Sequence, residues 1–573
     1  MKTKLSIGII AIALLSLSYF VNTKLTKEDT NPPPKVALNF IKCTSAKFLL
    51  EDVDTTKQIS PLFENLGNHH FSISTNNKMA QTFFNQGLRL TFAFNHAEAH
   101  RSFMEASRLD PSSAMTYWGQ AYTLGPNIND PQPDDERKKK SYEAIQKAKK
   151  LATNPKEKAL IEALSFRFSN DTTAIATLNM AYMKAMLKVV EKYGQDADIL
   201  TLFAASVMNT VPWNYWDKEG NPSPFIAEAK TALEKAININ PKHPGAHHYY
   251  IHMVELPKPD LAVASADILG SLMPAAGHIV HMPSHIYIRV GRYKDAVEVN
   301  QKAILADEDY ISQCYAQGMY PLGYYPHNIH FLWSAASLLG ASDIAIDAAK
   351  KTAEKVPVGE MKELHFLQNF ASIPLLAYTR FGKWNDILTM PKPNDEIKHL
   401  KLIWHYARGI AFLRKNNLKD AQEELEAIEV MMNDPELETI FATGFDNSAT
   451  IAKLAYEIVA GEIAATKGNL PKAVAHLNHA VTIEDQLIYN EPAAWYIPAR
   501  QTLGDILLKA QKYAEAEKIY TEDLAKLRQN GWSLMGLYQS LMIQGKIEEA
   551  EKIKKEFDKA WEHADIEINS SIL

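Results

Sequence analysis

The chain has 573 residues, of which 46% are apolar and 22% charged, and its net charge is -6. This length exceeds what one compact core can organise, so the chain forms either several domains or an elongated repeat array. The slight acidity, with no basic stretch interleaved with aromatic residues, excludes nucleic acid as an expected partner.

The first 22 residues predict export from the cytoplasm. Lys2 and Lys4 precede an apolar run of roughly 16 residues, which is the pattern of a secretion signal. A small-x-small cleavage site is missing, so the segment is either removed or kept as an N-terminal anchor, the only membrane contact we expect. We expect a periplasmic protein in which residues 23–78 form a linker, Pro-rich at TKEDTNPPPK, and an N-terminal extension.

An internal period begins at residue 79. In the stretch AQTFFNQGLRLTFAFNHAEAHRSFMEASRLDP, small residues at Gly87 and Ala99 let two helices approach closely, while aromatic residues such as Phe103 fill the space between them. The same spacing returns around Gly291, Gly409, Gly461 and Gly504. We therefore predict an all-α fold, an α-solenoid of about ten helical hairpins. Its expected sections are 79–240 with insertions, a His-rich 241–360, and 361–573.

This spacing resembles that of the tetratricopeptide repeat (TPR) family over nearly the whole chain. More narrowly, the motifs HPGAHHYYIH, HMPSHIYIRVGRY, YYPHNIHF and NGWSLMGL resemble those of exported bacterial TPR proteins with His-rich groove motifs. The resemblance implies the α-solenoid fold and the approximate repeat boundaries, and it implies no particular activity.

Nine of the 19 histidines lie between residues 243 and 330. Two His-x-x-x-His pairs, His248 with His252 and His281 with His285, follow the proline that ends each preceding helix at the same distance. They therefore occupy matched positions on the first helices of consecutive hairpins. A spacing of four puts both rings of a pair on one helical face. Because neighbouring helices lie roughly 10 Å apart, the two pairs are expected to converge in the concave groove.

Three more residues extend this predicted cluster. His327 and His330 stand three apart at the start of the next hairpin, and Glu255 lies one turn beyond His252. We predict a transition-metal site formed by His248, His252, Glu255, His281, His285, His327 and His330. Imidazoles with one carboxylate favour copper, iron, zinc or nickel over calcium or magnesium. The pattern lacks the Glu of H-E-x-x-H, so a zincin peptidase mechanism is not predicted. Nuclearity, and a role in catalysis, storage or sensing, stay open.

Other histidines have structural interpretations. His243, before a proline, is expected to be a loop or cap residue, and His247 cannot share the face of its neighbour His248. His278 either joins the groove or only begins a helix. Asn95 or His96 is expected to cap the second helix of the first hairpin. The matched pairs themselves would form a polar network lining the groove if no metal binds, because buried imidazoles need partners.

Aromatic residues stand close to the histidines in sequence. Tyr320, Tyr324 and Tyr325 precede His327 and are expected either to donate hydrogen bonds behind the ligands or to line a substrate pocket. Trp213 either packs an insertion between repeats or closes over the mouth of the groove.

Two other functions compete with a metal site. TPR arrays commonly bind a peptide or protein partner in the concave groove, but residues 241–330 offer few of the Lys, Arg and Asn side chains that peptide clamps use. Clustered imidazoles also suit a pH sensor. No nucleotide-binding or nucleophile-elbow motif is present, so the sequence leaves enzymatic activity open. Cys43 and Cys314 are too few for a Cys-based metal site and leave open a single bridge between them.

Overall fold

The computed structural model describes residues 56–313 and 320–573. The expected export segment and both cysteines lie outside these ranges. The described residues belong to one structural unit. No helix within the described ranges has the length and apolar character needed to cross a membrane.

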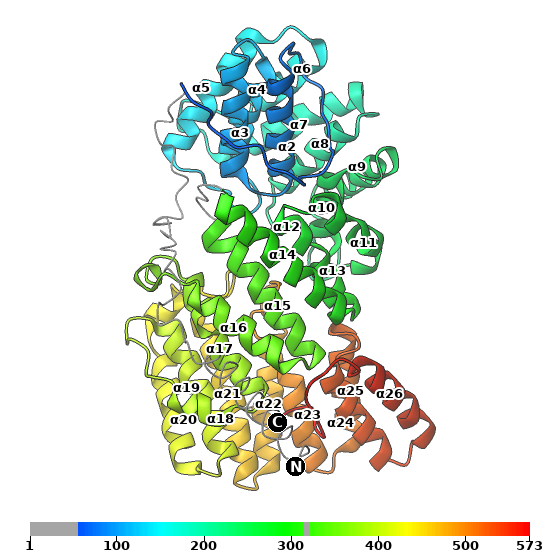
Figure 1. Cartoon of the computed structure of the whole chain (residues 1–573). Helices are drawn as coiled ribbons and strands as arrows, with labels where there is room; N and C mark the ends of the chain where they lie inside the picture. The colour runs from blue at the N-terminus through cyan, green and yellow to red at the C-terminus, as the bar shows by residue number, and fades with distance from the viewer. Residues whose placement is uncertain (1–55, 314–319) are drawn as a thin grey trace, which may run out of the picture. The chain divides into compact units, whose positions relative to one another are not determined.

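The described part of the chain is built from helices, which pair into twelve successive hairpins (Figure 1). The first four are α2 (Lys78–Phe92) with α3 (His96–Leu109), α4 (Ala114–Leu124) with α5 (Asp135–Leu151), α6 (Pro155–Ser165) with α7 (Ile175–Tyr193), and α8 (Ala197–Met208) with α9 (Ile226–Ile239). The central three are α10 (Pro244–Val254) with α11 (Val263–Leu272), α12 (Gly277–His281) and α13 (Pro283–Val290) with α14 (Tyr293–Gln313), and α15 (Tyr325–Leu339) with α16 (Ser342–Glu354).

Five further hairpins follow toward the C-terminus. They are α17 (Phe366–Arg380) with α18 (Trp384–Thr389), α19 (Lys398–Arg414) with α20 (Leu418–Met432), α21 (Ser448–Thr466) with α22 (Leu470–Glu484), α23 (Ala499–Lys509) with α24 (Tyr513–Lys526), and α25 (Gly531–Ile543) with α26 (Ile547–Ala560). Short turns of helix are η1 (Pro259–Ala262), η2 (Tyr320–Tyr324), η3 (Val358–Glu360) and η4 (Pro435–Glu438). The fold is an α-solenoid of TPR-like hairpins, as the sequence predicts. The section boundaries at residues 240 and 360 stay a prediction.

Close helix packing comes from aromatic rings held between glycines. A Cβ atom at Gly87 would lie 2.8 Å from the ring of Phe103, and one at Gly119 would lie 2.4 Å from it. The same arrangement recurs near the C-terminus, where the ring of Tyr520 lies between Gly504 and Gly536. In both places a ring on the second helix of one hairpin packs against the first helices of its own hairpin and of the next. This confirms the steric reason for the repeat.

The turn inside a hairpin commonly passes through one residue with a positive φ angle. The residues at this position are Phe94, Gly291, Gly340, Gly382, Asn416, Gly468, Gln511 and Gly545. Glycine accepts this conformation without steric cost, and Asn accepts it more readily than most residues. Phe94, at φ 57°, is the bulky exception.

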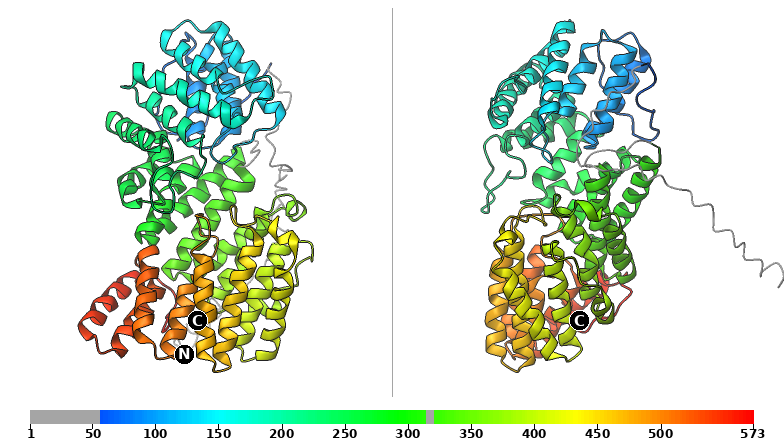
Figure 2. Two further views of the ribbon diagram at one scale, coloured as in Figure 1. Left: turned by 180° about the vertical axis from the view of Figure 1, so that it is seen from behind. Right: turned by 90° about the vertical axis from the view of Figure 1, so that its left-hand side faces the viewer.

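The C-terminal hairpins contact the central ones. The indole N–H of Trp532 donates a hydrogen bond to the carbonyl of Ser337 (3.0 Å), and the hydroxyl of Tyr293 donates to the carbonyl of Arg528 (2.7 Å). Figures 1 and 2 show the same approach, with α25 (red-orange) beside α13 and α15 (green). This contact brings the connection between α22 and α23, residues 485–498, toward the His-rich hairpins.

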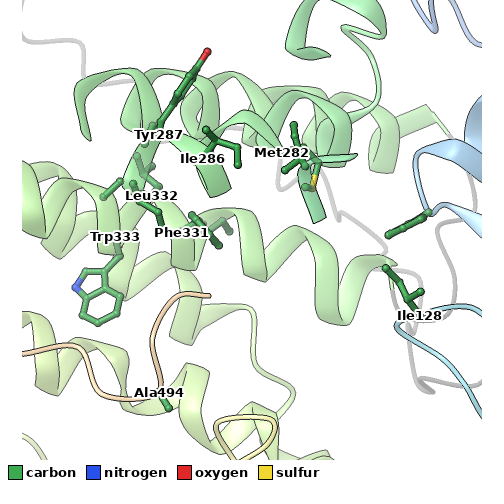
Figure 3. Packing of buried hydrophobic residues seen from close by; sticks show 14 of the residues in the cluster. Ile128, Met282, Ile286, Tyr287, Phe331, Leu332, Trp333 and Ala494 are labelled. Carbon is green, nitrogen blue, oxygen red and sulfur yellow. The ribbon is translucent and has the colours of Figure 1, made fainter. Parts of the chain in front are cut away.

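One continuous apolar core underlies these contacts. Figure 3 shows Met282 and Ile286 packed over Phe331 of α15, with Trp333 directed toward Ala494 of the α22–α23 connection. All five side chains are buried. The helices that carry the central histidines are therefore held in place by apolar contacts from three parts of the chain.

Replacing Gly119 by alanine should lower the free energy of unfolding by about 1–3 kcal/mol, because the added methyl group would overlap the Phe103 ring. The matched control is Gly359→Ala, since no atom lies within 4 Å of the Cβ position at Gly359. Urea unfolding followed by circular dichroism should show a lower midpoint for Gly119→Ala only. Equal midpoints for the two variants would contradict the packing role of Gly119.

Candidate functional site

Six histidines from three consecutive hairpins converge in the interior of the array. They form two groups of three, His248, His252 and His278, and His281, His285 and His327. Within each group, one ring nitrogen of every histidine lies within 4.8 Å of the others. A third group, His252, Glu255 and His285, joins the two triads. The two triads and Glu255, taken together, are called the histidine cluster below.

The pairs with a spacing of four lie as the sequence predicts. The ring centroids of His248 and His252 on α10 are 4.9 Å apart, and so are those of His281 and His285. Pro283 lacks an N–H group and interrupts the helix between α12 and α13. Met282 nevertheless keeps helical angles, φ -50° and ψ -35°, so His281 and His285 stay one turn apart.

Hydrogen bonds determine which ring nitrogen of His248 and of His252 carries no proton. Nδ1 of His248 donates to the carbonyl of Phe92 (2.6 Å), and Nδ1 of His252 faces Oε1 of Glu255 at 3.5 Å. Because a carbonyl and a carboxylate only accept hydrogen bonds, the protons are on Nδ1. Both Nε2 atoms are then bare acceptors, and both are buried with no hydrogen-bond partner within the described residues.

His278 completes the first triad with two unpaired nitrogens. Both of its ring nitrogens are buried without a partner in the described structure. Its backbone N–H donates to the hydroxyl of Tyr320 (3.3 Å), and its ring lies 4.8 Å from that of Tyr324. A buried imidazole without a partner costs free energy, so a polar network made only of these side chains does not account for the arrangement.

In the second triad, the proton position on His281 follows from Asn300. The side-chain amide of Asn300 donates to the carbonyl of Ala296 (2.7 Å), so its oxygen accepts from Nδ1 of His281 (2.7 Å). Nε2 of His281 is therefore a bare acceptor. It lies 2.9 Å from Nε2 of His285, and the two can meet only through a shared proton or a cation.

Two carboxylates hold the other side of His285. Its Nδ1 lies 3.0 Å from Oε2 of Glu255 and 2.9 Å from Oε2 of Glu491. Burial alone would lower the pKa of His285, but the two carboxylates outweigh it and raise the pKa to about 9. Without a metal, the imidazolium of His285 thus supplies the proton that faces His281. Burial opposes the ionised form of Glu255 too, but His285 and His252 hold the pKa of Glu255 below its usual range.

Glu491 is the residue of this site that the sequence pattern did not reveal. It lies on the α22–α23 connection, and Tyr489 donates a hydrogen bond to it. Burial raises the pKa of Glu491, against the opposing contact with His285. The only signal in the sequence is an acidic residue within a connection longer than an ordinary TPR turn.

A cavity of about 540 Å³ opens beside the histidine cluster. Part of its lining comes from the cluster itself and from Glu491. The aromatic side chains that line it are Phe94, Trp213, Tyr320, Tyr324, Phe366, Phe370, Phe445 and Tyr489. Trp213, which the sequence assigned either to packing or to the groove mouth, lies edge-on to His252 with ring centroids 5.1 Å apart. Tyr325 faces away and donates to Glu308.

The structure separates His330 from the other predicted ligands. Residues three apart lie roughly 60° apart around a helix, so the direction of the His330 ring is set by what it packs against. Its ring packs against Trp333, Phe370 and Tyr496 at centroid distances of 5.5, 5.4 and 5.3 Å. Burial lowers the pKa of His330 to about 3. The remaining predicted ligands, His248, His252, Glu255, His281, His285 and His327, lie together, and His278 joins them.

His69, His243 and His247 show a different pattern. His243 caps α10 through Nδ1, which accepts a backbone N–H, and its Nε2 lies 3.2 Å from Asp198. Asp198 also pairs with His69 at 2.8 Å, so His69, Asp198 and His243 form a separate histidine–carboxylate group. His247 pairs with Ser265 at 2.9 Å. These imidazoles have partners in the protein, whereas those of the first triad lack them on the side that faces its centre.

The buried carboxyl group of Asp307 is linked to His278 through Tyr320. Asp307 on α14 accepts hydrogen bonds from the hydroxyl of Tyr320 and the amide of Asn328, both at 2.7 Å. Tyr320 in turn accepts the backbone N–H of His278. Burial raises the pKa of Asp307 to about 7, against the effect of these two hydrogen bonds.

Asp307 should make stability fall as the pH rises. The folded protein keeps its proton up to about pH 7, whereas the unfolded chain loses it near 3.8. Stability is then fully present below pH 4 and is lost between pH 4 and 7, by up to roughly 4 kcal/mol. In Asp307→Asn this loss should disappear, which thermal melts at pH 5 and pH 8 in EDTA would measure. Parallel pH profiles for the two proteins would refute the assignment.

Comparisons with known proteins find similar solved structures only, all at low sequence identity. No family model matches the chain, and no curated protein matches it. The human IFIT1 dimer with m7Gppp-AAAA is 13% identical over 86% of this chain and 92% of that chain, at a TM-score of 0.30. Ypp1 is 11% identical over 86% of this chain and 77% of that chain, at a TM-score of 0.44. The APC/C hetero-tetramer Cut9-Hcn1 is 12% identical over 86% of this chain and 76% of that chain, at a TM-score of 0.28. At these scores the likenesses carry no functional inference, and any function rests on the residues of the site itself.

Proposed function

We propose that the protein binds two neighbouring transition-metal ions, one in each histidine triad. The observation that carries this proposal is the set of buried, unpartnered nitrogens in the first triad, on His248, His252 and His278. Bare imidazole nitrogens at this separation are suited to copper, iron or zinc. The close approach of His281 and His285 supports the second ion, because a cation would take the place of the proton between them.

The groups behind the triads support the same proposal. Histidines that bind metals almost always donate their other N–H to a carbonyl, carboxylate or amide oxygen, which fixes the tautomer and makes the ring a stronger ligand. The carbonyl of Phe92 accepts from His248 in this way, and the amide oxygen of Asn300 accepts from His281. Nδ1 of His285 instead forms ion pairs with Glu255 and Glu491. A structural polar network would instead use both nitrogens of each ring.

The number of ligands favours a site that acts on a small molecule. Three protein ligands leave a tetrahedral ion with one open position, which is typical of catalytic sites rather than of closed structural ones. The cavity beside the cluster gives a further ligand access to that position. With the export signal expected in residues 1–22, the proposed place of action is the periplasm.

A protein-interaction scaffold without metal is the competing function. A peptide would need charged or amide side chains free to bind its backbone or terminus. Amides do line the cavity, but those of Asn129 and Asn490 already donate to Tyr324 and to the carbonyl of Thr443. Variants of the site histidines are expected to fold under either function. The measurement that distinguishes the two functions is therefore the metal content of the protein.

Untagged protein should contain about two transition-metal ions per chain by inductively coupled plasma mass spectrometry. The double variant His248→Ala/His281→Ala should lose both, because it removes one ligand from each triad. His330→Ala is the matched control, since His330 is also a buried histidine of the same segment but lies apart from the triads. It should keep its metal.

Circular dichroism and gel filtration would establish that each variant is folded. Absence of metal after incubation with copper, iron and zinc in turn would refute the proposal and favour the interaction scaffold. Equal loss of metal in His330→Ala would show that the triads are not the ligand sets.

A further inference from the structure

Phe94, which lies beside the histidine cluster and lines the cavity, has an unfavourable backbone conformation. Phe94 occupies the left-handed turn position that is held by Gly in five other hairpins, as at Gly291 and Gly340. The left-handed conformation brings the Cβ atom of a non-glycine residue too close to the backbone, so the turn is strained at Phe94. The ring of Phe94 is thereby placed 4.3 Å from that of His248 and 5.4 Å from that of His278.

Trp213 repeats this feature on a second segment. It also has a positive φ angle, 62°, and it lies in the connection between α8 and α9. Its ring meets His252, whose ring is stacked parallel to that of Phe94 at 5.8 Å. Two of the three aromatic residues with a positive φ angle in the described ranges therefore lie beside one triad and one cavity, and the third, Phe225, precedes α9. Strain of this kind persists where the surrounding structure enforces it, and it concentrates at ligand sites.

The cavity has the size and chemistry of a small-molecule site. A volume of about 540 Å³ lies within the range of pockets that enclose small organic molecules. Its aromatic walls favour a planar ring, which can stack or lie edge-on against them. The charged groups at its edge are already paired, Arg137 with Asp130 and His285 with Glu255. A charged ligand would find no free partner among them.

A polar group of the ligand has defined partners. His96 lines the same cavity, and both of its ring nitrogens are buried without a partner in the described residues. Burial lowers the pKa of His96 to about 3, so the ring is neutral and has both a donor and an acceptor nitrogen. His278, with its two unpaired nitrogens, lines the cavity as well.

We propose that this cavity binds a small, uncharged aromatic molecule carrying a hydroxyl group, with its ring between Phe94 and Trp213 and its hydroxyl on a free imidazole nitrogen. This inference rests on the proposed metal site, since the molecule would lie against the open side of the triads. Its chemical class is that of phenols and naphthols.

The probe for this proposal is 2-naphthol, measured by isothermal titration calorimetry on zinc-loaded protein. We expect 2-naphthol to bind roughly tenfold more tightly than decahydro-2-naphthol, which keeps the hydroxyl but has no aromatic ring. Naphthalene-2-sulfonate, which is aromatic but charged, should bind more weakly as well. Equal affinities for the three compounds, or no binding of 2-naphthol, would overturn the inference.

Two variants test the wall itself. Phe94→Gly keeps the turn in the form that other hairpins use, and Phe94→Leu keeps apolar bulk without the ring. Both should lose most of the preference for 2-naphthol over its saturated analogue. Phe166→Leu is the matched control, because Phe166 is 51% exposed and lies outside the cavity. Unchanged selectivity in both Phe94 variants would contradict the role of the ring.

Parallel titrations of metal-stripped protein, with metal content measured on the same samples, separate this inference from the function on which it rests. Zinc bound in the triads without selective binding of 2-naphthol overturns the inference alone. Selective binding by protein that takes up no metal from solutions of copper, iron or zinc overturns the metal site and retains the aromatic pocket.

Discussion

The contact of His285 with Glu255 and Glu491 is the interaction on which the site depends. All three side chains are buried, and a buried charge is tolerated only where opposite charges and hydrogen bonds offset its loss of water. Glu255 comes from the preceding hairpin, whereas Glu491 comes from a connection more than two hundred residues away. The contact of Trp532 with Ser337 holds the distant hairpins against the central ones. Loss of that packing would leave His285 with one carboxylate and the cavity without one of its walls.

The stiffness of the array gives the histidine cluster its geometry. Each ring held between two glycines, as Phe103 is, fixes the separation of neighbouring helices. Side chains at matched positions then meet at set distances, which a flexible loop could not maintain. Strain enters at few places, and Phe94 is one of them. Most other hairpin turns with a positive φ use Gly, Asn or Gln, whereas Phe94 and Trp213 place aromatic rings in this conformation beside the cavity.

Local patterns allowed the fold and most of the candidate site to be predicted. The repeat period and the spacing of His248 from His252 are properties of short stretches of sequence, so they can be recognised without knowledge of the tertiary structure. Glu491 could not be found in this way, because its approach depends on how the C-terminal hairpins close on the central ones. His330 illustrates a second limit. Its spacing from His327 does not determine where its ring points, which depends on packing against Trp333 and Tyr496. His278 lies too near the start of α12 for periodicity to orient it.

The order of these groups along the chain has a consequence for assembly. His248, His252 and His278 lie on two consecutive hairpins, so folding of a short stretch is enough to bring them together. The second triad forms only after α15 has folded, because His327 lies on that helix. Glu491 joins the site only when the last third of the chain has folded. A chain that folds from its N-terminal side therefore brings the first triad together before residues 489–491 add their part of the cavity wall. The first triad is thus most exposed to its surroundings while the C-terminal hairpins have yet to pack against the central ones.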